Sequence, residues 1–178
     1  MTSAALDLHR PALSRSDLLA TPVADALHGW EHAGGVAVAP IDPDLADTAA
    51  FVEAYGVPLE RSANCVVVGG RRDGVERIAA CVVLATTRAD VNGVVRRALD
   101  VRKASFLPME RAVELTSMEY GGITPIGLPA GWLLLVDAAV TVAGEVVVGS
   151  GLRRSKIQLP GSDLALLPGA SVVDGLAR

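Results

Sequence analysis

Short apolar runs separated by polar, glycine-rich turns occupy most of the middle of the chain, a pattern typical of β-strands. Residues 65–68 and 77–84 are two such runs on either side of a turn at residues 69–74, and this arrangement predicts a β-hairpin. Further strands are predicted over residues 36–41, 132–136, 140–142, 145–148, 157–159 and 171–173.

Helical spacing of apolar residues occurs between these strands. In residues 47–55, Asp47 stands at the N-cap position, Phe51 and Ala54 share one face, and Gly56 follows the last turn. Further helices are predicted over residues 21–27, 87–99, 110–115 and 163–165. Helices and strands alternate irregularly and without an internal repeat, so the expected fold class is α+β (α/β mixed), with helices packed on a mixed sheet.

Acidic residues are concentrated near the start of the chain. Residues 1–60 hold nine acids and two bases, a net charge of −7, and the remainder holds 14 bases and 11 acids, a net charge of +3. A length of 178 residues favours one main domain. We therefore predict an N-terminal helical extension over residues 1–40 and one domain over residues 41–178.

The composition narrows the classes of protein that fit. With 51% hydrophobic and 20% charged residues, the chain is not disordered throughout. Only 3% of the residues are aromatic, which argues against a broad aromatic platform for single-stranded nucleic acid. No secretory signal or bilayer-length apolar run is visible. We expect a cytoplasmic protein whose partners include neither a membrane nor DNA.

Residues 28–32 match the HxxEH spacing of inverted zinc peptidases, with His28 and His32 as the two ligands and Glu31 as the base. Gly29 inside the motif and a Gly-Gly pair directly after it weaken a helical zinc site. We expect a protein without metal or cofactor, and a metallohydrolase centred on His28 and His32 remains the less favoured alternative.

The two cysteines are also candidates for chemistry. Cys65 and Cys81 both lie in apolar strand runs, where cysteine packs as a small hydrophobic residue. No histidine follows position 32, so a cysteine–histidine couple would have to reach back to the N-terminal segment. Core packing is the favoured interpretation for both thiols.

The segment 120–129 is the most informative loop. Gly121, Gly122 and Gly127 allow the backbone to approach a ligand closely, while Pro125 and Pro129 stiffen the loop. Such a loop suits the wall of a small pocket, although the residues alone fit a purely structural loop equally well. A second turn, at residues 149–151, is followed by three basic residues, and its backbone N–H groups could approach an anion.

Together these segments resemble the YbaK family of free-standing aminoacyl-tRNA deacylases, which are similar to the editing domain inserted in bacterial prolyl-tRNA synthetase. The resemblance covers residues 45–175. It implies a mixed, barrel-like sheet packed with helices and an editing domain over residues 41–178. It also implies hydrolysis, in trans, of the ester that joins a wrong amino acid to the tRNA 3′ end. Water would attack with help from the ribose hydroxyl of the substrate itself.

The resemblance also suggests roles for individual residues. It implies that the GxxxP loop from Gly121 to Pro125 shapes the amino-acid pocket and supports the ester oxygen through its backbone. The implied catalytic residues are Asn64, Gly121, Gly122 and Pro125. The implied substrate-binding residues are Cys65, Ile123, Thr124, Asp137, Ser150, Gly151, Arg153, Arg154 and Lys156, the last three on tRNA phosphates.

One position departs from the family pattern. Many members carry a lysine where this chain has Asn64 (or Ala63, depending on one gap). Asparagine can hydrogen-bond a substrate, but it supplies no charge. Two readings stay open: a deacylase acting on the aminoacylated 3′ end of tRNA, or a weakly active module that binds tRNA, an aminoacyl-nucleotide or an aminoacyl-tRNA synthetase.

Overall fold

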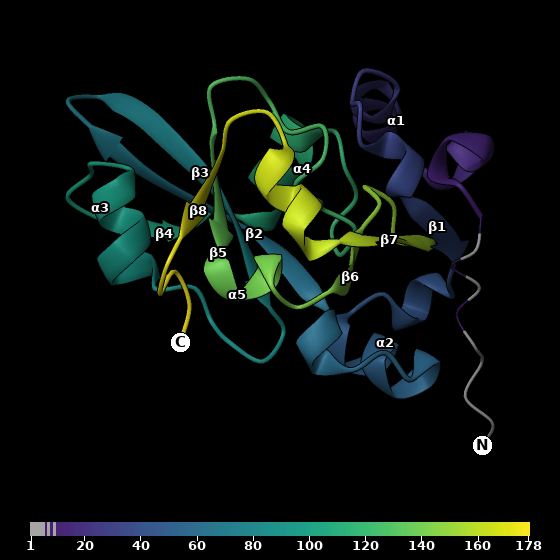
Figure 1. Cartoon of the computed structure of the whole chain (residues 1–178). Helices are drawn as coiled ribbons and strands as arrows, with labels where there is room; N and C mark the ends of the chain where they lie inside the picture. Colours follow the sequence, from purple (N-terminus) through teal and green to yellow (C-terminus); the bar gives the residue numbers. More distant parts are fainter. Residues whose placement is uncertain (1–5, 7, 9) are drawn as a thin grey trace.

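The computed structural model describes residues 6, 8 and 10–178, which form two β-sheets surrounded by helices (Figure 1). The smaller sheet has the strand order β1-β7-β6, and all of its pairs are antiparallel. Its strands are β1 (Ala37–Pro40), β6 (Glu145–Gly149) and β7 (Ser155–Pro160). The larger sheet has the order β4-β2-β3-β5-β8. Its strands are β2 (Ala63–Arg72), β3 (Val75–Leu84), β4 (Ala104–Phe106), β5 (Leu133–Asp137) and β8 (Ala170–Val173).

The larger sheet is mixed, which confirms the predicted fold class. Strands β4, β2 and β3 are antiparallel neighbours, whereas β3, β5 and β8 run parallel. A parallel bridge between Ser62 and Val147 joins the start of β2 to β6 of the other sheet. In the part of the chain that the structure describes, the two sheets meet there without closing into a barrel.

The predicted hairpin is formed by β2 and β3, which pair over their full lengths. Its turn consists of Asp73 and Gly74 alone, with φ of 51° and 81°, and is shorter than predicted because an Asp-Gly pair at positive φ suffices to reverse the chain. Gly69 and Gly70 belong to β2 instead. A Cβ at Gly70 would lie 2.6 Å from the carbonyl oxygen of Lys103, so the strand passes close to its neighbour there.

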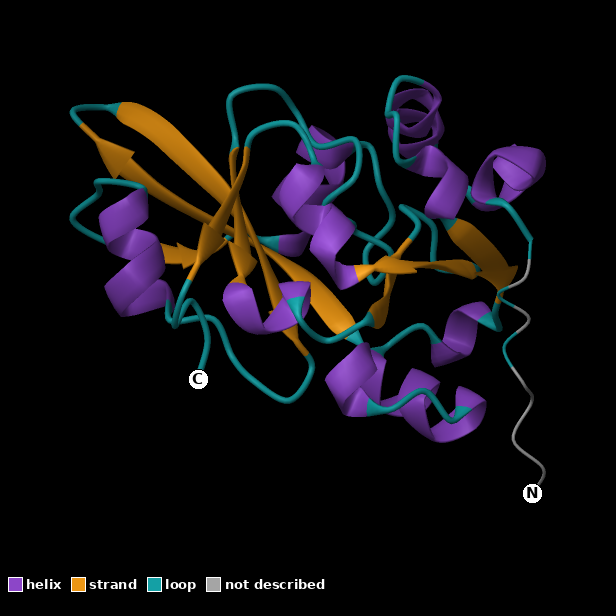
Figure 2. Ribbon diagram, in the orientation of Figure 1, coloured by secondary structure: helices purple, strands orange, loops and turns teal. Residues whose placement is uncertain are grey.

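Helices cover both sheets (Figure 2). They are α1 (Thr21–His28), α2 (Thr48–Tyr55), α3 (Arg96–Ala98), α4 (Met109–Thr116) and α5 (Ala138–Thr141), with 3₁₀ segments that include Ala12–Leu18 and Gly161–Leu166. The predicted helices at residues 21–27, 47–55 and 110–115 are confirmed.

One sequence prediction of secondary structure was wrong. Residues 140–142 were expected to form a strand, but α5 occupies this region because the Asp137 carboxylate accepts a hydrogen bond from the amide of Ala139 and caps the turn. The capped helix expected over residues 87–99 is confirmed from Val91 onward, where a π-helical turn, Val91–Val95, continues into α3. Asp90 caps this turn through the amides of Gly93 and Val94.

The N-terminal segment packs against the smaller sheet. Strand β1 pairs with β7, and the buried side chains of Val23 and Leu27 from α1 belong to the same core cluster as Ile157 and Leu159. The boundary between residues 40 and 41 therefore falls at the end of a strand that shares its core with the rest of the chain. The division into an extension and a domain stays a prediction, and its residues 1–5, 7 and 9 lie outside the described residues. No helix in the described part is long and apolar enough to cross a membrane.

The shared core makes Leu27 a test of this arrangement. Leu27→Ala is expected to lower the free energy of unfolding of the whole protein by about 2–5 kcal/mol, because it opens a cavity in a closed core. Leu13→Ala, at a position that is 37% exposed, is the matched control and should cost much less. Urea denaturation measures both. A separate early transition confined to the N-terminal segment would contradict a shared core.

Candidate functional site

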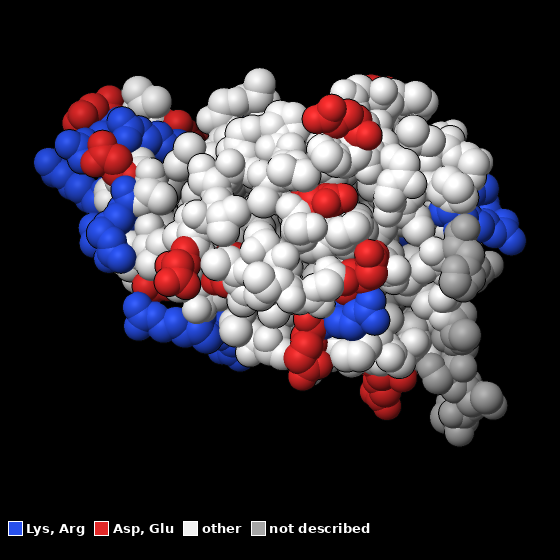
Figure 3. Space-filling view, viewed as in Figure 1, with Lys and Arg blue, Asp and Glu red and all other residues white. Residues whose placement is uncertain are grey.

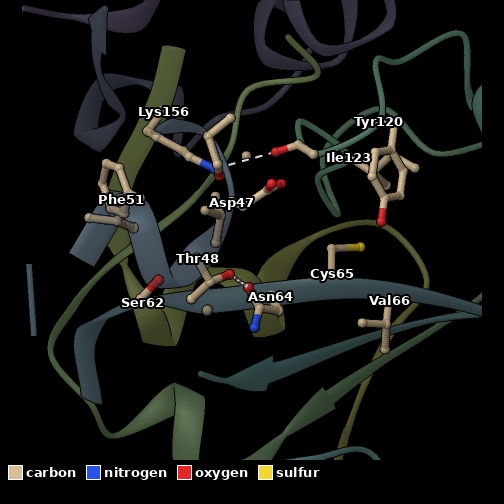
Figure 4. Close-up of a pocket in the computed structure, with 16 residues that line it drawn as sticks. Asp47, Thr48, Phe51, Ser62, Asn64, Cys65, Val66, Tyr120, Ile123 and Lys156 are labelled. Atoms are coloured by element: carbon tan, nitrogen blue, oxygen red, sulfur yellow. Dashed lines mark hydrogen bonds between the residues drawn. The ribbon is translucent and has the colours of Figure 1, made fainter. Parts of the chain in front are cut away.

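A cavity of about 240 Å³ lies where the two sheets meet (Figure 4). It is lined by residues from α2, from the beginning of β2, from β6 and β7, and from the loop that follows α4. Phe51 and Val147 contribute apolar surface, and Asp47, Asn64 and Lys156 contribute polar groups. The cavity therefore combines an apolar interior with charged and amide side chains.

One wall of the cavity is held by backbone hydrogen bonds between two loops. The amide of Glu119 donates to the carbonyl oxygen of Gly151 at 2.8 Å, and the amide of Gly151 donates to the carbonyl oxygen of Gly122 at 2.7 Å. The amide of Arg153 donates to the Glu119 carboxylate at 2.6 Å. We call this set of contacts the loop clamp. A Cβ at Gly122 would lie 2.6 Å from the backbone of Leu152, so the clamp needs glycine at this position.

Gly121 lies between the clamp residues Glu119 and Gly122 and lines the cavity with a left-handed φ of 82°. A Cβ there would come within 2.5 Å of the Arg153 guanidinium. The amides of Gly121 and Ile123 donate no hydrogen bond within the described part of the chain. Backbone donors without a partner beside a cavity suit an oxygen atom of a ligand.

Lys156 extends from β7 into the cavity (Figure 4). Its Nζ donates to the carbonyl oxygens of Ala46 at 3.0 Å and Gly121 at 3.4 Å, and it lies 5.3 Å from the centroid of the Phe51 ring. The pKa of Lys156 is lowered to about 8, mainly by burial and also by the nearby charge of Arg153, while Asp47 opposes the change. Lys156 therefore lines the cavity, and its expected contact with tRNA phosphates stays a prediction.

Asn64 lines the cavity beside Thr48, whose hydroxyl donates to its Oδ1 at 2.9 Å (Figure 4). This bond engages the amide oxygen and orients the side chain. Cys65 lines the cavity as well. Burial raises the pKa of the Cys65 thiol well above its ordinary value and that of Cys81 to about 12, so both remain protonated and unsuited to nucleophilic attack at neutral pH.

Several residues assigned by resemblance do not line this cavity. Gly122 and Gly151 belong to the loop clamp. Pro125 lines a different cavity beside Trp30, and Thr124 is fully buried without a hydrogen-bond partner for its hydroxyl in the described part. The side chains of Ser150 and Asp137 form hydrogen bonds with other residues of the chain. Ser150 bonds to Ser155, and Asp137 accepts from the amides of Ala139 and Ala177.

The two arginines after the second turn hold the loops together. Arg153 donates to the carbonyl oxygens of Pro43 and Tyr120, each at 3.2 Å, and lies 3.5 Å from Asp47. Arg154 donates to the carbonyl oxygen of Asp17 at 2.8 Å. Their expected role on tRNA phosphates stays a prediction.

The lining residues that sequence reasoning missed include Asp47, Thr48, Phe51 and Tyr120. Three of them follow the helical spacing of α2 and read as ordinary helix and cap positions. One sequence feature could have pointed to them. The predicted helix ends before Gly56 and a strand is predicted soon after it, so the chain reverses there and brings α2 close to β2.

The histidines of the HxxEH motif do not converge. His28 Nδ1 is hydrogen-bonded to the carbonyl oxygen of Ala24, and His32 lies 3.5 Å from Glu31 with its ring against Trp30. Among the residues that the structure describes, no three His, Cys, Asp or Glu side chains are grouped as metal ligands would be. The donor set for the alternative zinc site is therefore incomplete.

The family of the protein follows from comparison with known domains. A model of the aminoacyl-tRNA editing domain matches residues 42–167, more than half of the chain. The protein therefore belongs to the aminoacyl-tRNA editing domain family, as its resemblance to YbaK-type proteins predicted.

Solved structures share this fold. One is a candidate trans-editing enzyme for prolyl tRNA synthetase, with 22% sequence identity over 87% of this chain and 94% of that chain and a TM-score of 0.73. Another comes from a study of epitope backbone grafting onto scaffold proteins, with 21% identity over 87% of this chain and 95% of that chain and a TM-score of 0.73.

Burial of Lys156 makes stability depend on pH. Its pKa is about 8 in the folded protein against an ordinary value of 10.5, so the unfolded chain binds more protons between these values. The contribution of Lys156 to the free energy of unfolding is therefore expected to rise from about pH 8 to about pH 10.5, by about 3 kcal/mol at most.

Urea denaturation of wild-type protein and of Lys156→Met, at neutral pH and at about pH 10, measures this contribution. The difference in the free energy of unfolding should shift in favour of the wild type as the pH rises. Titration of the cysteines is common to both proteins and cancels. An identical difference at both pH values would contradict burial of the ammonium.

Proposed function

We propose that the protein hydrolyses, in trans, the ester bond between the 3′ end of tRNA and a wrongly attached amino acid. The observation that carries this proposal is a cavity lined by Gly121 and Ile123, whose amides have no partner among the described residues, and by Lys156, in a chain of the aminoacyl-tRNA editing family. The amides and the ammonium would each stabilise negative charge on the ester oxygen, and they belong to residues that line the same cavity.

The cavity suits one aminoacyl group. Its volume of about 240 Å³ lies below the range of roughly 300–1,000 Å³ for pockets that enclose a drug-sized ligand. The amino-acid side chain would lie against Phe51 and Val147, and the nucleoside would remain outside. Selection would rest on size, for which one methylene group is worth about 1–3 kcal/mol.

The negative charge that develops during hydrolysis requires donors. Attack by water forms a carbon–oxygen bond and places charge on the former carbonyl oxygen, before the bond to the ribose oxygen breaks and that oxygen takes up the proton. The amides of Gly121 and Ile123 and the ammonium of Lys156 would stabilise this charge. The neighbouring hydroxyl of the substrate ribose would assist the attacking water, because the cysteines are protonated and none of the histidines that the structure describes lines the cavity.

Lys156 also accounts for the departure at Asn64. We infer that β7 supplies here the positive charge that many family members supply from the strand position of Asn64. Asn64, oriented by Thr48, would then hold the substrate through its amide NH₂ group. With asparagine at position 64 and lysine at position 156, these two positions together place one cation in the cavity.

Deacylation of a panel of mischarged tRNAs tests the proposal. Lys156→Met is expected to lower kcat by about 100-fold or more, as for loss of one donor to a developing oxyanion. Arg88→Met, which removes an exposed cation elsewhere, is the control and should leave the rate unchanged. The enzymatic rate of the wild type, after subtraction of spontaneous hydrolysis, should fall as the pH rises through about 8.

Equal rates for wild-type protein and Lys156→Met would remove the ammonium from the mechanism. Binding of tRNA by the wild type with no hydrolysis of any member of the panel would overturn the enzymatic proposal and favour a binding module of the same fold.

A further inference from the structure

A second hollow, which we call the groove, borders the cavity along β2, towards β4 and α4. The cavity and the groove share Cys65, Val66, Tyr120 and Ile123. Beyond these shared residues, the groove is lined by Val67, Phe106, Leu107, Met109 and Ala112. The two hollows are therefore neighbours, and a ligand that spans both would pass these four residues.

The groove carries two exposed aromatic rings. The chain has only two Trp, two Tyr and two Phe residues, and Phe106 and Tyr120 are 59% and 54% exposed. The ring contacts found in the structure join Trp30 to His32 and Phe51 to Tyr55, and neither involves the groove. Exposed flat rings in a groove are surfaces on which nucleic-acid bases stack.

Both rings are attached to fixed backbone. Phe106 lies on β4 opposite Val68 of β2, and the amide of Leu107 donates to the carbonyl oxygen of Val67 at 2.9 Å. The carbonyl oxygen of Tyr120 accepts a hydrogen bond from Arg153 next to the loop clamp. Stacking on these rings would therefore need little ordering of the protein, which favours binding.

A positively charged region adjoins the far end of the groove. Residues 69–105 hold eight bases and four acids, a net charge of +4, in a chain whose net charge is −4. Figure 3 shows Lys and Arg side chains gathered over the end of the molecule where the β2–β3 hairpin and α3 lie. Arg102 and Lys103, directly before β4, are exposed and make no side-chain hydrogen bond or ion pair within the described residues.

We propose that this groove binds the unpaired 3′-terminal nucleotides of an RNA. The bases stack on Tyr120 and Phe106, and the following phosphates lie near Arg102 and Lys103. The proposal rests on the proposed function, because an ester on the terminal ribose must enter the cavity while its base lies directly outside, where Tyr120 borders both hollows. The position of the groove next to the cavity and the basic residues beside it favour RNA over an apolar peptide segment.

Binding of uncharged RNA tests this inference separately from hydrolysis. The probe is an RNA hairpin with an unpaired 3′ end, in which the terminal adenine is replaced by fluorescent 2-aminopurine, and the comparison is the same hairpin with a blunt end. Phe106→Leu and Tyr120→Leu are each expected to raise Kd for the unpaired end about 5-fold to 150-fold and to reduce fluorescence quenching. Binding of the blunt hairpin should be unchanged.

Two variants control for structural damage. Phe106→Tyr keeps a ring in the groove and should restore wild-type binding and quenching. Val172→Ala alters a half-exposed apolar residue on β8, at the other edge of the sheet, and should leave both unchanged.

Salt dependence tests the charged region. Lys103→Gln should reduce the slope of log K against log salt concentration by about 0.7, the loss of one phosphate contact to single-stranded nucleic acid. Arg15→Gln, in the N-terminal segment, removes an equal charge and should leave the slope unchanged.

The outcomes separate the two proposals. Equal binding of unpaired and blunt hairpins, or no effect of Phe106→Leu and Tyr120→Leu, overturns the groove as an RNA site, whatever the hydrolytic activity. Ring-dependent binding of the unpaired end by a protein that hydrolyses no mischarged tRNA supports the groove and overturns only the enzymatic function.

Discussion

The close contact between the loop after α4 and the turn after β6 is the constraint on which the site depends. The backbones approach so closely that glycine is required at positions 122 and 149, where a Cβ would meet the opposite backbone. The hydrogen bonds of the loop clamp then fix the position of Gly121, which lies between Glu119 and Gly122 and lines the cavity. A wall held in this way cannot yield to a larger ligand without breaking several bonds, and therefore the size of the cavity can discriminate between ligands.

The buried ammonium of Lys156 is a consequence of this wall. Its Nζ bonds to two carbonyl oxygens, one of which belongs to Gly121, so the cation and the loop stabilise each other's position. Burial still disfavours the charged form, as the lowered pKa shows. A cation that is incompletely compensated by the protein interacts more favourably with a negative ligand oxygen than a solvated one does.

Elements with local signals could be predicted from the sequence. The Asp-Gly turn specifies the hairpin, and Gly56 in the left-handed region ends α2 as expected. The β-branched residues near Val140 suggested a strand, but the cap from Asp137 and the packing of α5 prevailed. For the site, the stiff glycine- and proline-containing loop was recognised, and Gly121 and Ile123 do line the cavity.

The partners of the basic residues could not be predicted, because they depend on contacts between distant segments. Arg153 and Lys156 bond to carbonyl groups 110 residues earlier in the chain, and Arg154 to one 137 residues earlier. Which face of β7 meets the cavity depends on its pairing with β1 and β6. The exposure of Phe106 likewise depends on β4 lying at the edge of its sheet. The cluster of basic residues in the sequence therefore indicated positive charge, but it did not show which of these side chains remain free to bind a ligand.

A structure of the protein bound to an adenosine that carries an amino acid through a non-hydrolysable amide tests the central claim most directly. The account predicts the amino-acid side chain against Phe51 and Val147, with its carbonyl oxygen near the amides of Gly121 and Ile123 and Nζ of Lys156. An acyl group bound in the cavity beside Trp30, or bound with its carbonyl oxygen away from these donors, would contradict it.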